Sequence, residues 1–168
     1  MKKLVFFFFF SSLLIAHSYG QNLSNHIVVL RVGDGTNLLT KNANPVFIEV
    51  YSPNWTLKHV LPLPTAITGS NKMLTLTNNT HEGYISLTTD KLVVAGYNAA
   101  VGTLTPNANA AIDRTIGFVN ERGGINTSMS ISDAGATSIR SVISNGTGAW
   151  MFGSFVLRYA PQIGRAHV

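Results

Sequence analysis

The sequence predicts an all-β protein built from antiparallel sheets. Short runs of β-branched and aromatic residues recur about every 8–15 residues, separated by Gly, Asn, Pro and Asp. No long stretch shows a sustained helical period of apolar residues. We expect strands over His26–Val32, Val46–Tyr51, Thr56–Leu63, Met73–Thr77, Tyr84–Thr88, Leu92–Tyr97, Thr115–Asn120, Ile125–Ile131, Ile139–Ser144, Ala149–Phe152 and Ser154–Tyr159.

Three turns join neighbouring runs into hairpins. Pro53-Asn54 suits a type I or II turn, because Pro fixes φ and Asn tolerates a positive φ. The two glycines of Gly123-Gly124 supply left-handed conformations, and Asn145-Gly146 is a strong hairpin signal. The flanking strands alternate, as expected for a sheet with one apolar and one polar face. One face holds Leu57, His59, Leu61 and Leu63; another holds Ile125, Thr127, Met129 and Ile131, with Asn126, Ser128, Ser130 and Ser132 opposite.

The hairpins repeat along the chain. Residues 84–97 resemble 140–153, and residues 47–63 resemble 116–131, at offsets of about 55–70 residues. Each period holds two hairpins, and four antiparallel strands form one blade of a β-propeller. The interval Asn98 to Asp113 is small and polar, so we expect a flexible loop there. We predict an incomplete β-propeller of about two four-stranded blades, its first blade lacking the opening strand; a β-sandwich is the alternative.

Both ends of the chain are expected to lie outside this domain. Residues 1–20 have a positive start, an apolar middle and small residues before Gln21, the pattern of a secretory signal peptide. A membrane anchor is the alternative, but the apolar run is shorter than the roughly 20 residues of a spanning helix. Residues 163–168 read like the translation of a sequencing-library adapter, so we interpret them as an adapter-derived tail. The partial propeller is therefore assigned to residues 21–162, and the parent protein is expected to continue beyond them.

Composition narrows the classes of function. The formal net charge is +5, but removing Lys2, Lys3 and Arg165 leaves nine basic residues against seven acidic ones. The remaining Lys and Arg are scattered, so we expect no nucleic-acid partner. The chain has no cysteine, which excludes disulfides, thiolate metal sites and a lipoprotein anchor. We expect a protein that is secreted or held at the cell surface, with no stable membrane insertion after signal cleavage.

The residues also resemble a known group of proteins. The segments 28–35, 44–51, 69–72 and 82–84 are similar to the start of exported bacterial β-propeller-like repeat proteins. The similarity covers about residues 26–160. It implies a repeat fold and export, and it implies no catalytic residues, because none is established for the group.

No motif assigns catalytic, cofactor or metal chemistry. The histidines lack zinc-site spacing, and His59 is better explained as a packed residue than as a ligand. His81-Glu82 is a weak candidate for an acid/base pair. The loops holding Asp34, Glu82 and Asp113 would have to bring two carboxylates together for glycoside hydrolysis.

The predicted function is an extracellular binding or scaffold module for an unknown protein or polysaccharide. Trp55, in a turn, is the possible ligand contact, whereas Trp150 is expected in the core. The alternative is a fragment of a secreted carbohydrate-active propeller enzyme. Because an incomplete propeller leaves apolar faces uncovered, we expect residues 21–162 alone to aggregate or to fold only in part.

Overall fold

A computed structural model of the chain describes residues 25–88 and 90–161. The predicted signal peptide and adapter-derived tail lie outside the described residues. Within this part the fold is all-β, as predicted, with every strand pair antiparallel. The elements are β1 (Ile27–Val32), β2 (Val46–Tyr51), β3 (Leu57–Pro62), β4 (Ser86–Leu87), β5 (Lys91–Tyr97), the short 3-10 helix η1 (Pro106–Ala108), β6 (Arg114–Asn120), β7 (Ile125–Ile131), β8 (Ile139–Ser144), β9 (Gly148–Gly153) and β10 (Leu157–Pro161).

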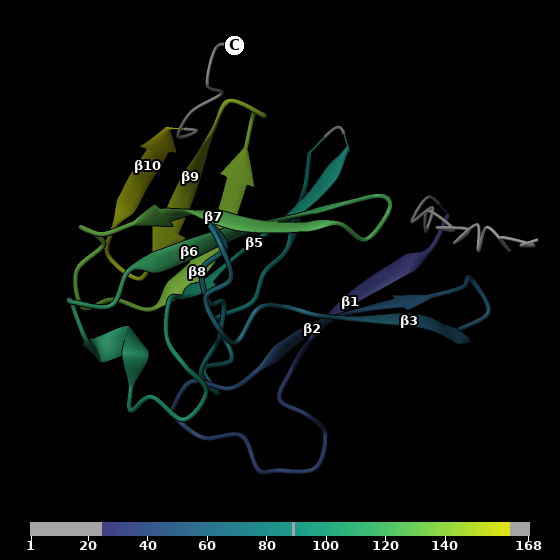
Figure 1. The fold of residues 1–168 in the computed structure, drawn as a ribbon, viewed down its shortest axis with the longest axis horizontal. Helices are drawn as coiled ribbons and strands as arrows, with labels where there is room; N and C mark the ends of the chain where they lie inside the picture. The colour runs from purple at the N-terminus through teal and green to yellow at the C-terminus, as the bar shows by residue number, and fades with distance from the viewer. Residues whose placement is uncertain (1–24, 89, 162–168) are drawn as a thin grey trace, which may run out of the picture.

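The strands form three small sheets, each made of consecutive strands. The first sheet has the order β1-β2-β3, the middle sheet β4-β5-β6-β7, and the third sheet β10-β9-β8. Figure 1 shows β8–β10 running across the direction of β5–β7, while β1–β3 extend to the right of the molecule. Strand β8 contacts β4 and β5, and β10 contacts β7. No described helix is long and apolar enough to cross a membrane.

Most predicted strands are confirmed to within a few residues, but three differ. The predicted strand Met73–Thr77 is wrong, because this segment makes only single bridges, Thr75 to Tyr97 and Leu76 to Asn44. Strand β4 keeps only two of its predicted five residues. Strand β10 begins late, at Leu157, because the chain turns at Gly153–Val156, where the Gly153 N–H donates to the Val156 carbonyl at 2.7 Å.

All three predicted turns are present, but in the first two the positive φ values differ from those that the sequence predicted. In the β2–β3 turn the positive φ, 61°, falls on Trp55 rather than Asn54. In the β6–β7 turn only Gly123 is left-handed, and Asn120 Oδ1 accepts from the Gly124 N–H at 2.8 Å. In the β8–β9 turn Gly146 has φ 89°, as that turn requires.

The predicted single apolar face of β7 is divided by a bulge. Ile116 pairs with Met129 and Phe118 pairs with Asn126, so β7 has one extra residue between these pairs. Met129 and Asn126 therefore share a face, although they are three residues apart. Thr127 lies on the other side, where its Oγ1 donates to the Lys72 carbonyl at 2.7 Å. This polar threonine is fully buried, beside the segment that contains Lys72.

The middle sheet lies between the other parts of the fold. On one face Phe118 shares a small cavity with Ser144 and Gly148 of the third sheet. On the other face Leu74 packs so closely that a Cβ at Gly96 or Gly117 would lie within 2.8 Å of its side chain. At Gly96 the Cβ would also lie 2.8 Å from the Thr75 carbonyl oxygen, so glycine is required there, where the 71–77 segment crosses the sheet; a side chain at Gly117 would require Leu74 to move. The core forms on both faces of this sheet.

Arg114, at the start of β6, is fully buried. Its guanidinium donates to the carbonyls of Gly135 at 2.7 Å and Thr137 at 3.0 Å, in the segment that leads into β8. It also donates to the Ile112 carbonyl and, at 3.4 Å, to those of Asn107 and Asn109. The loop predicted to be flexible is thus tied to the same side chain as the β7–β8 connection.

Tyr97 extends this buried polar group. The Arg114 guanidinium lies 4.9 Å from the Tyr97 ring centre. The Tyr97 hydroxyl donates to Glu82 Oε1 at 2.6 Å and accepts from the Ile139 N–H at 3.2 Å. Burial, and then the Glu82 carboxylate, raise the pKa of Tyr97 above its ordinary value. Arg114 and Tyr97 therefore connect three segments that are distant in sequence: the one that contains Glu82, the loop before β6 and the connection into β8.

We predict that Arg114→Met destabilises the fold by roughly 3 kcal/mol or more, because several buried carbonyls lose a charged donor. The matched control is Arg158→Met, whose partly exposed ion pair with Asp133 should contribute at most about 1 kcal/mol. Urea unfolding followed by circular dichroism measures both. Equal effects of the two substitutions would contradict the assigned role of Arg114.

Candidate functional site

Trp55, the ligand contact predicted from the sequence, lies in the turn between β2 and β3. Its side chain is 68% exposed. The Trp55 N–H donates to the Ser52 carbonyl at 2.9 Å, and the Ser52 N–H donates to the Thr56 carbonyl at 3.0 Å. These bonds hold Trp55 at φ 61°, a conformation that is rare for a bulky residue. A hydrogen-bonded turn with an uncommon backbone conformation at Trp55 thus carries a large aromatic side chain into solvent.

The residues around Trp55 form the outer face of the first sheet. The register pairs Ile27 with Tyr51, Val29 with Glu49 and Arg31 with Phe47, which places all six on one side. The Tyr51 ring lies 6.1 Å from that of Trp55. The opposite side carries Val46, Ile48 and Val50, which are fully buried. We call the solvent-facing side the outer face; its large exposed apolar residues are Val29, Trp55, Leu57 and Val60.

An ion pair occupies the centre of the outer face. Arg31 Nε donates to Glu49 Oε1 at 2.5 Å, and the Tyr51 hydroxyl donates to Glu49 Oε2 at 2.7 Å. The Arg31 guanidinium also covers the Phe47 ring at 4.2 Å. The Arg31 and Tyr51 hydrogen bonds lower the pKa of Glu49, and the bond to Glu49 raises the pKa of Tyr51. The face therefore presents aromatic rings around a charged pair whose geometry is already set.

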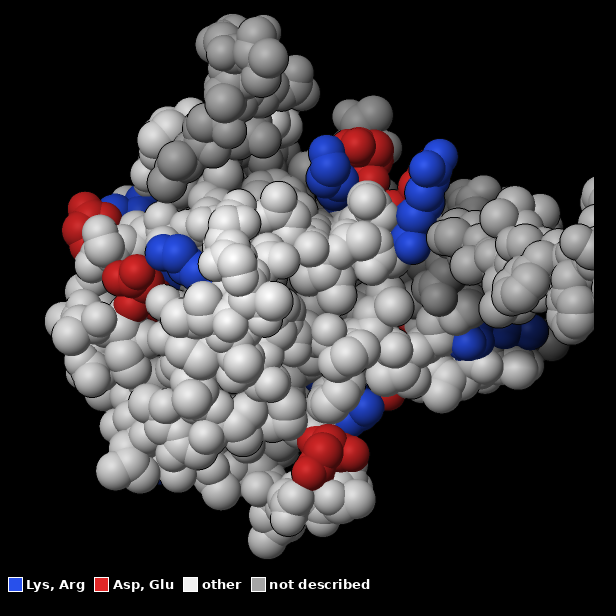
Figure 2. All heavy atoms as spheres, in the orientation of Figure 1, with Lys and Arg blue, Asp and Glu red and all other residues white. Residues whose placement is uncertain are grey.

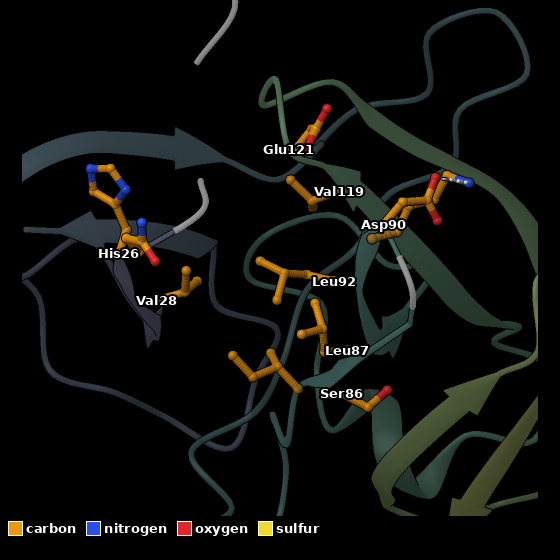
Figure 3. A pocket seen from close by; sticks show the side chains of 11 residues that line it. His26, Val28, Ser86, Leu87, Asp90, Leu92, Val119 and Glu121 are labelled. Carbon is orange, nitrogen blue, oxygen red and sulfur yellow. Dashed lines mark ion pairs between the residues drawn. The ribbon is translucent and has the colours of Figure 1, made fainter. Parts of the chain in front are cut away.

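A groove of about 500 Å³ separates the start of β1 from one end of the middle sheet (Figure 3). Apolar side chains line it from both sides, with Val28 on β1 facing Leu92 and Val119 on the middle sheet. A groove of this volume with a mainly apolar lining falls within the range of ligand sites. The remaining lining residues are Asn25, His26, Ile85, Ser86, Leu87, Asp90, Lys91 and Glu121.

Two carboxylates lie at the same end of the middle sheet, beside this groove. Lys91 pairs with Asn120 in the β5–β6 register, so Asp90 and Glu121 occupy adjacent turns. Lys91 Nζ lies 3.1 Å from Asp90 Oδ2. Nothing in the sequence marks this pair, because each residue lies in or beside an ordinary turn. Only strand register brings them together.

The carboxylates named for the enzyme alternative are engaged separately. Asp34 caps its own turn, accepting from the Thr36 and Asn37 N–H groups at 2.9 Å. Those bonds, first that from Asn37, lower its pKa well below the ordinary range. Glu82 binds Thr77 and Tyr97, and Asp113 lies 3.6 Å from Lys72 Nζ. The three carboxylates thus have different partners.

The structure assigns no acid/base or metal-binding role to the two histidine candidates, His81 and His59. His81 is exposed and Glu82 points inward to Tyr97, so the suggested acid/base pair is not formed. His59 is half-buried on the inner side of β3, opposite Val50, which fits packing. Among the described residues no three His, Asp or Glu side chains group as a metal site.

The second tryptophan, predicted to lie in the core, is only half-buried. Trp150 is on the outside of the third sheet, where its ring lies 5.0 Å from that of Tyr159. The strand assignment was correct, but alternation along β9 buries Ala149 and Met151 and turns Trp150 outward.

Charge is dispersed over the surface seen in Figure 2. Blue and red side chains lie in small separate groups on a mainly uncharged surface. The described ion pairs join Arg31 to Glu49, Lys72 to Asp113, Lys91 to Asp90 and Arg158 to Asp133. This face therefore carries no continuous basic track.

Comparison with known proteins adds no assignment: no family model, curated protein or solved structure matches the chain.

We predict that Glu49→Gln lowers stability at neutral pH by up to about 1 kcal/mol, and that this loss shrinks on acidification. The folded-state pKa of Glu49 is below its ordinary value of 4.5. Its stabilisation is therefore present above that value and is lost as pH falls through the folded pKa. Urea melts of both proteins between neutral pH and about pH 3 test this. A stability difference that stays constant over the range would contradict it.

Proposed function

We propose that this chain is an extracellular binding or scaffold module whose outer face on β1–β3 contacts the ligand. The observation that carries the proposal is Trp55, 68% exposed and held at φ 61°. Strained backbone at a bulky residue is costly and clusters at functional positions. Nothing in the packing of the core requires the Trp55 ring to be where it is.

A polysaccharide is the ligand class that the chemistry of this face favours. The Trp55 and Tyr51 rings offer apolar surface for the C–H face of a sugar. Hydrogen-bonding groups lie beside the rings: the Arg31–Glu49 pair, and the turn residues Ser52 and Asn54. Because Arg31 and Glu49 are already paired, they would bind hydroxyls without a new ordering cost.

The propeller arrangement is part of the proposal. The first sheet is a three-stranded meander and the middle sheet a four-stranded one, which supports one unit without its opening strand followed by a complete unit. β8–β10 would then begin a third unit. The packing of β8–β10 across one face of the middle sheet also fits the β-sandwich alternative. Export is proposed from the N-terminal pattern of residues 1–20.

The groove supports a second candidate, a carbohydrate-active enzyme fragment. Asp90 and Glu121 lie beside the same groove, and paired carboxylates are the usual catalytic groups of glycosidases. Asp90 and Glu121 both line this cavity.

Binding through Trp55 is tested by native affinity electrophoresis in gels that contain a β-glucan, a galactomannan or a pectin. We expect retardation by at least one polymer, and Trp55→Ala to weaken it about tenfold through loss of ring contact. The control, Trp150→Phe, should be retarded like the parent. It also leaves Trp55 as the sole tryptophan, so its fluorescence should respond to the polymer.

Two results would count against polysaccharide binding at this face. One is the absence of retardation by every polymer. The other is retardation that Trp55→Ala leaves unchanged, which would place the sugar site elsewhere.

The enzyme candidate predicts release of reducing sugar from one of the same polymers, abolished by Asp90→Asn and by Glu121→Gln. Trp55 is not among the residues that line the groove, so Trp55→Ala should retain the ability to cleave small chromogenic glycosides. Activity that survives both carboxylate substitutions would refute the role of this pair.

A further inference from the structure

The outside of the third sheet is a second apolar surface, separate from the outer face around Trp55. The strand register forms two rows across it. One row joins Ile143, Trp150 and Tyr159; the other joins Ser141, Phe152 and Leu157. The opposite side of the same strands carries Val142, Ala149 and Met151, which are buried. We call the two rows the third-sheet face.

The third-sheet face exposes large side chains that a self-contained domain would cover. Ile143 is 52% exposed, Phe152 41%, Leu157 55% and Tyr159 51%. None of the six residues in the two rows carries a charge, and Arg140 lies in the bulge outside them. Contiguous apolar patches of this kind on soluble proteins mark interaction sites.

The size of the face fits a particular occupant. Large aromatic side chains each bury roughly 150–250 Å² and Ile and Leu somewhat less; with four of the five apolar side chains about half exposed and Trp150 less exposed, the face offers on the order of 350–550 Å². Two such faces pressed together would remove roughly 700–1,100 Å² from water, the size of a weak, concentration-dependent interface. An ordinary polar protein surface would not match the apolar character of the third-sheet face, whereas a second copy of the same face would.

We propose that the third-sheet face binds the same face of a second copy of this chain, giving a two-fold symmetric dimer. Two uncharged faces can meet without repulsion between like charges. Two copies of the outer face would instead bring their Arg31–Glu49 pairs together. Sheet-on-sheet packing is already how this chain buries the other side of β8–β10. A two-fold contact uses the same face twice and therefore closes at two copies.

The test is sedimentation velocity of the purified full chain from about 1 to 100 μM, with far-ultraviolet circular dichroism to monitor folding. We expect a concentration-dependent monomer–dimer equilibrium. Phe152→Lys, at the centre of the face, should weaken the dimer at least tenfold. The matched control is Val60→Lys on the outer face, where the replaced side chain is 39% exposed; it should dimerise like the parent.

A milder variant covers the possibility that Phe152→Lys does not fold. Leu157→Thr, at an exposed position with a residue suited to strands, should also weaken the dimer while keeping the parent spectrum. A parent chain that stays monomeric to 100 μM overturns the proposal. So does open-ended aggregation, or a dimer that Val60→Lys dissociates and the third-sheet substitutions do not.

Discussion

The fold depends on one buried guanidinium. A charge placed inside a protein must find partners, because leaving it unpaired costs several kcal/mol. Arg114 meets this requirement with backbone carbonyls from two loops and with the ring of Tyr97. If the loop before β6 or the connection before β8 adopted another conformation, the Arg114 guanidinium would lose its hydrogen-bond acceptors. The middle and third sheets are oriented toward each other by the same contacts, since Tyr97 also receives the first N–H of β8.

The strands were predictable from the sequence because their signals are local. Alternation and turn residues lie within a few positions of one another, and β2, β7 and β8 have the predicted bounds. The errors have non-local causes. Met73–Thr77 has strand composition, but it bridges two different partners and so forms no ladder. The bulge in β7 depends on its pairing with β6, and nothing within β7 marks it.

The candidate site likewise contains one residue with a local sequence signal and others that only strand pairing brings together. Trp55 stood out because it is an aromatic residue beside Pro53-Asn54 in an expected turn. Its neighbours Arg31 and Glu49 are 18 residues apart, and only the β1–β2 register makes them a pair. The groove carboxylates, Asp90 and Glu121, become neighbours for the same reason. The sequence pattern thus pointed to one residue of the outer face, Trp55, whereas its other residues are brought together only by cross-strand pairing. Arg114 gave no signal, because an arginine at the start of a strand is ordinarily exposed.

The meander topology has a consequence for how the chain reaches this fold. Each sheet is drawn from one contiguous stretch, 27–62, 86–131 or 139–161, so no strand must wait for a distant one before it pairs. Contacts that are short in sequence form quickly, and the sheets would appear in N- to C-terminal order during synthesis. The Arg114 contacts form after β7, since two of their carbonyls, those of Gly135 and Thr137, lie between β7 and β8, and the third sheet packs in place only once β8–β10 have been made. Until that point the apolar side of the middle sheet that receives β8–β10 is open, and this interval is when a newly made chain is most vulnerable to misassembly.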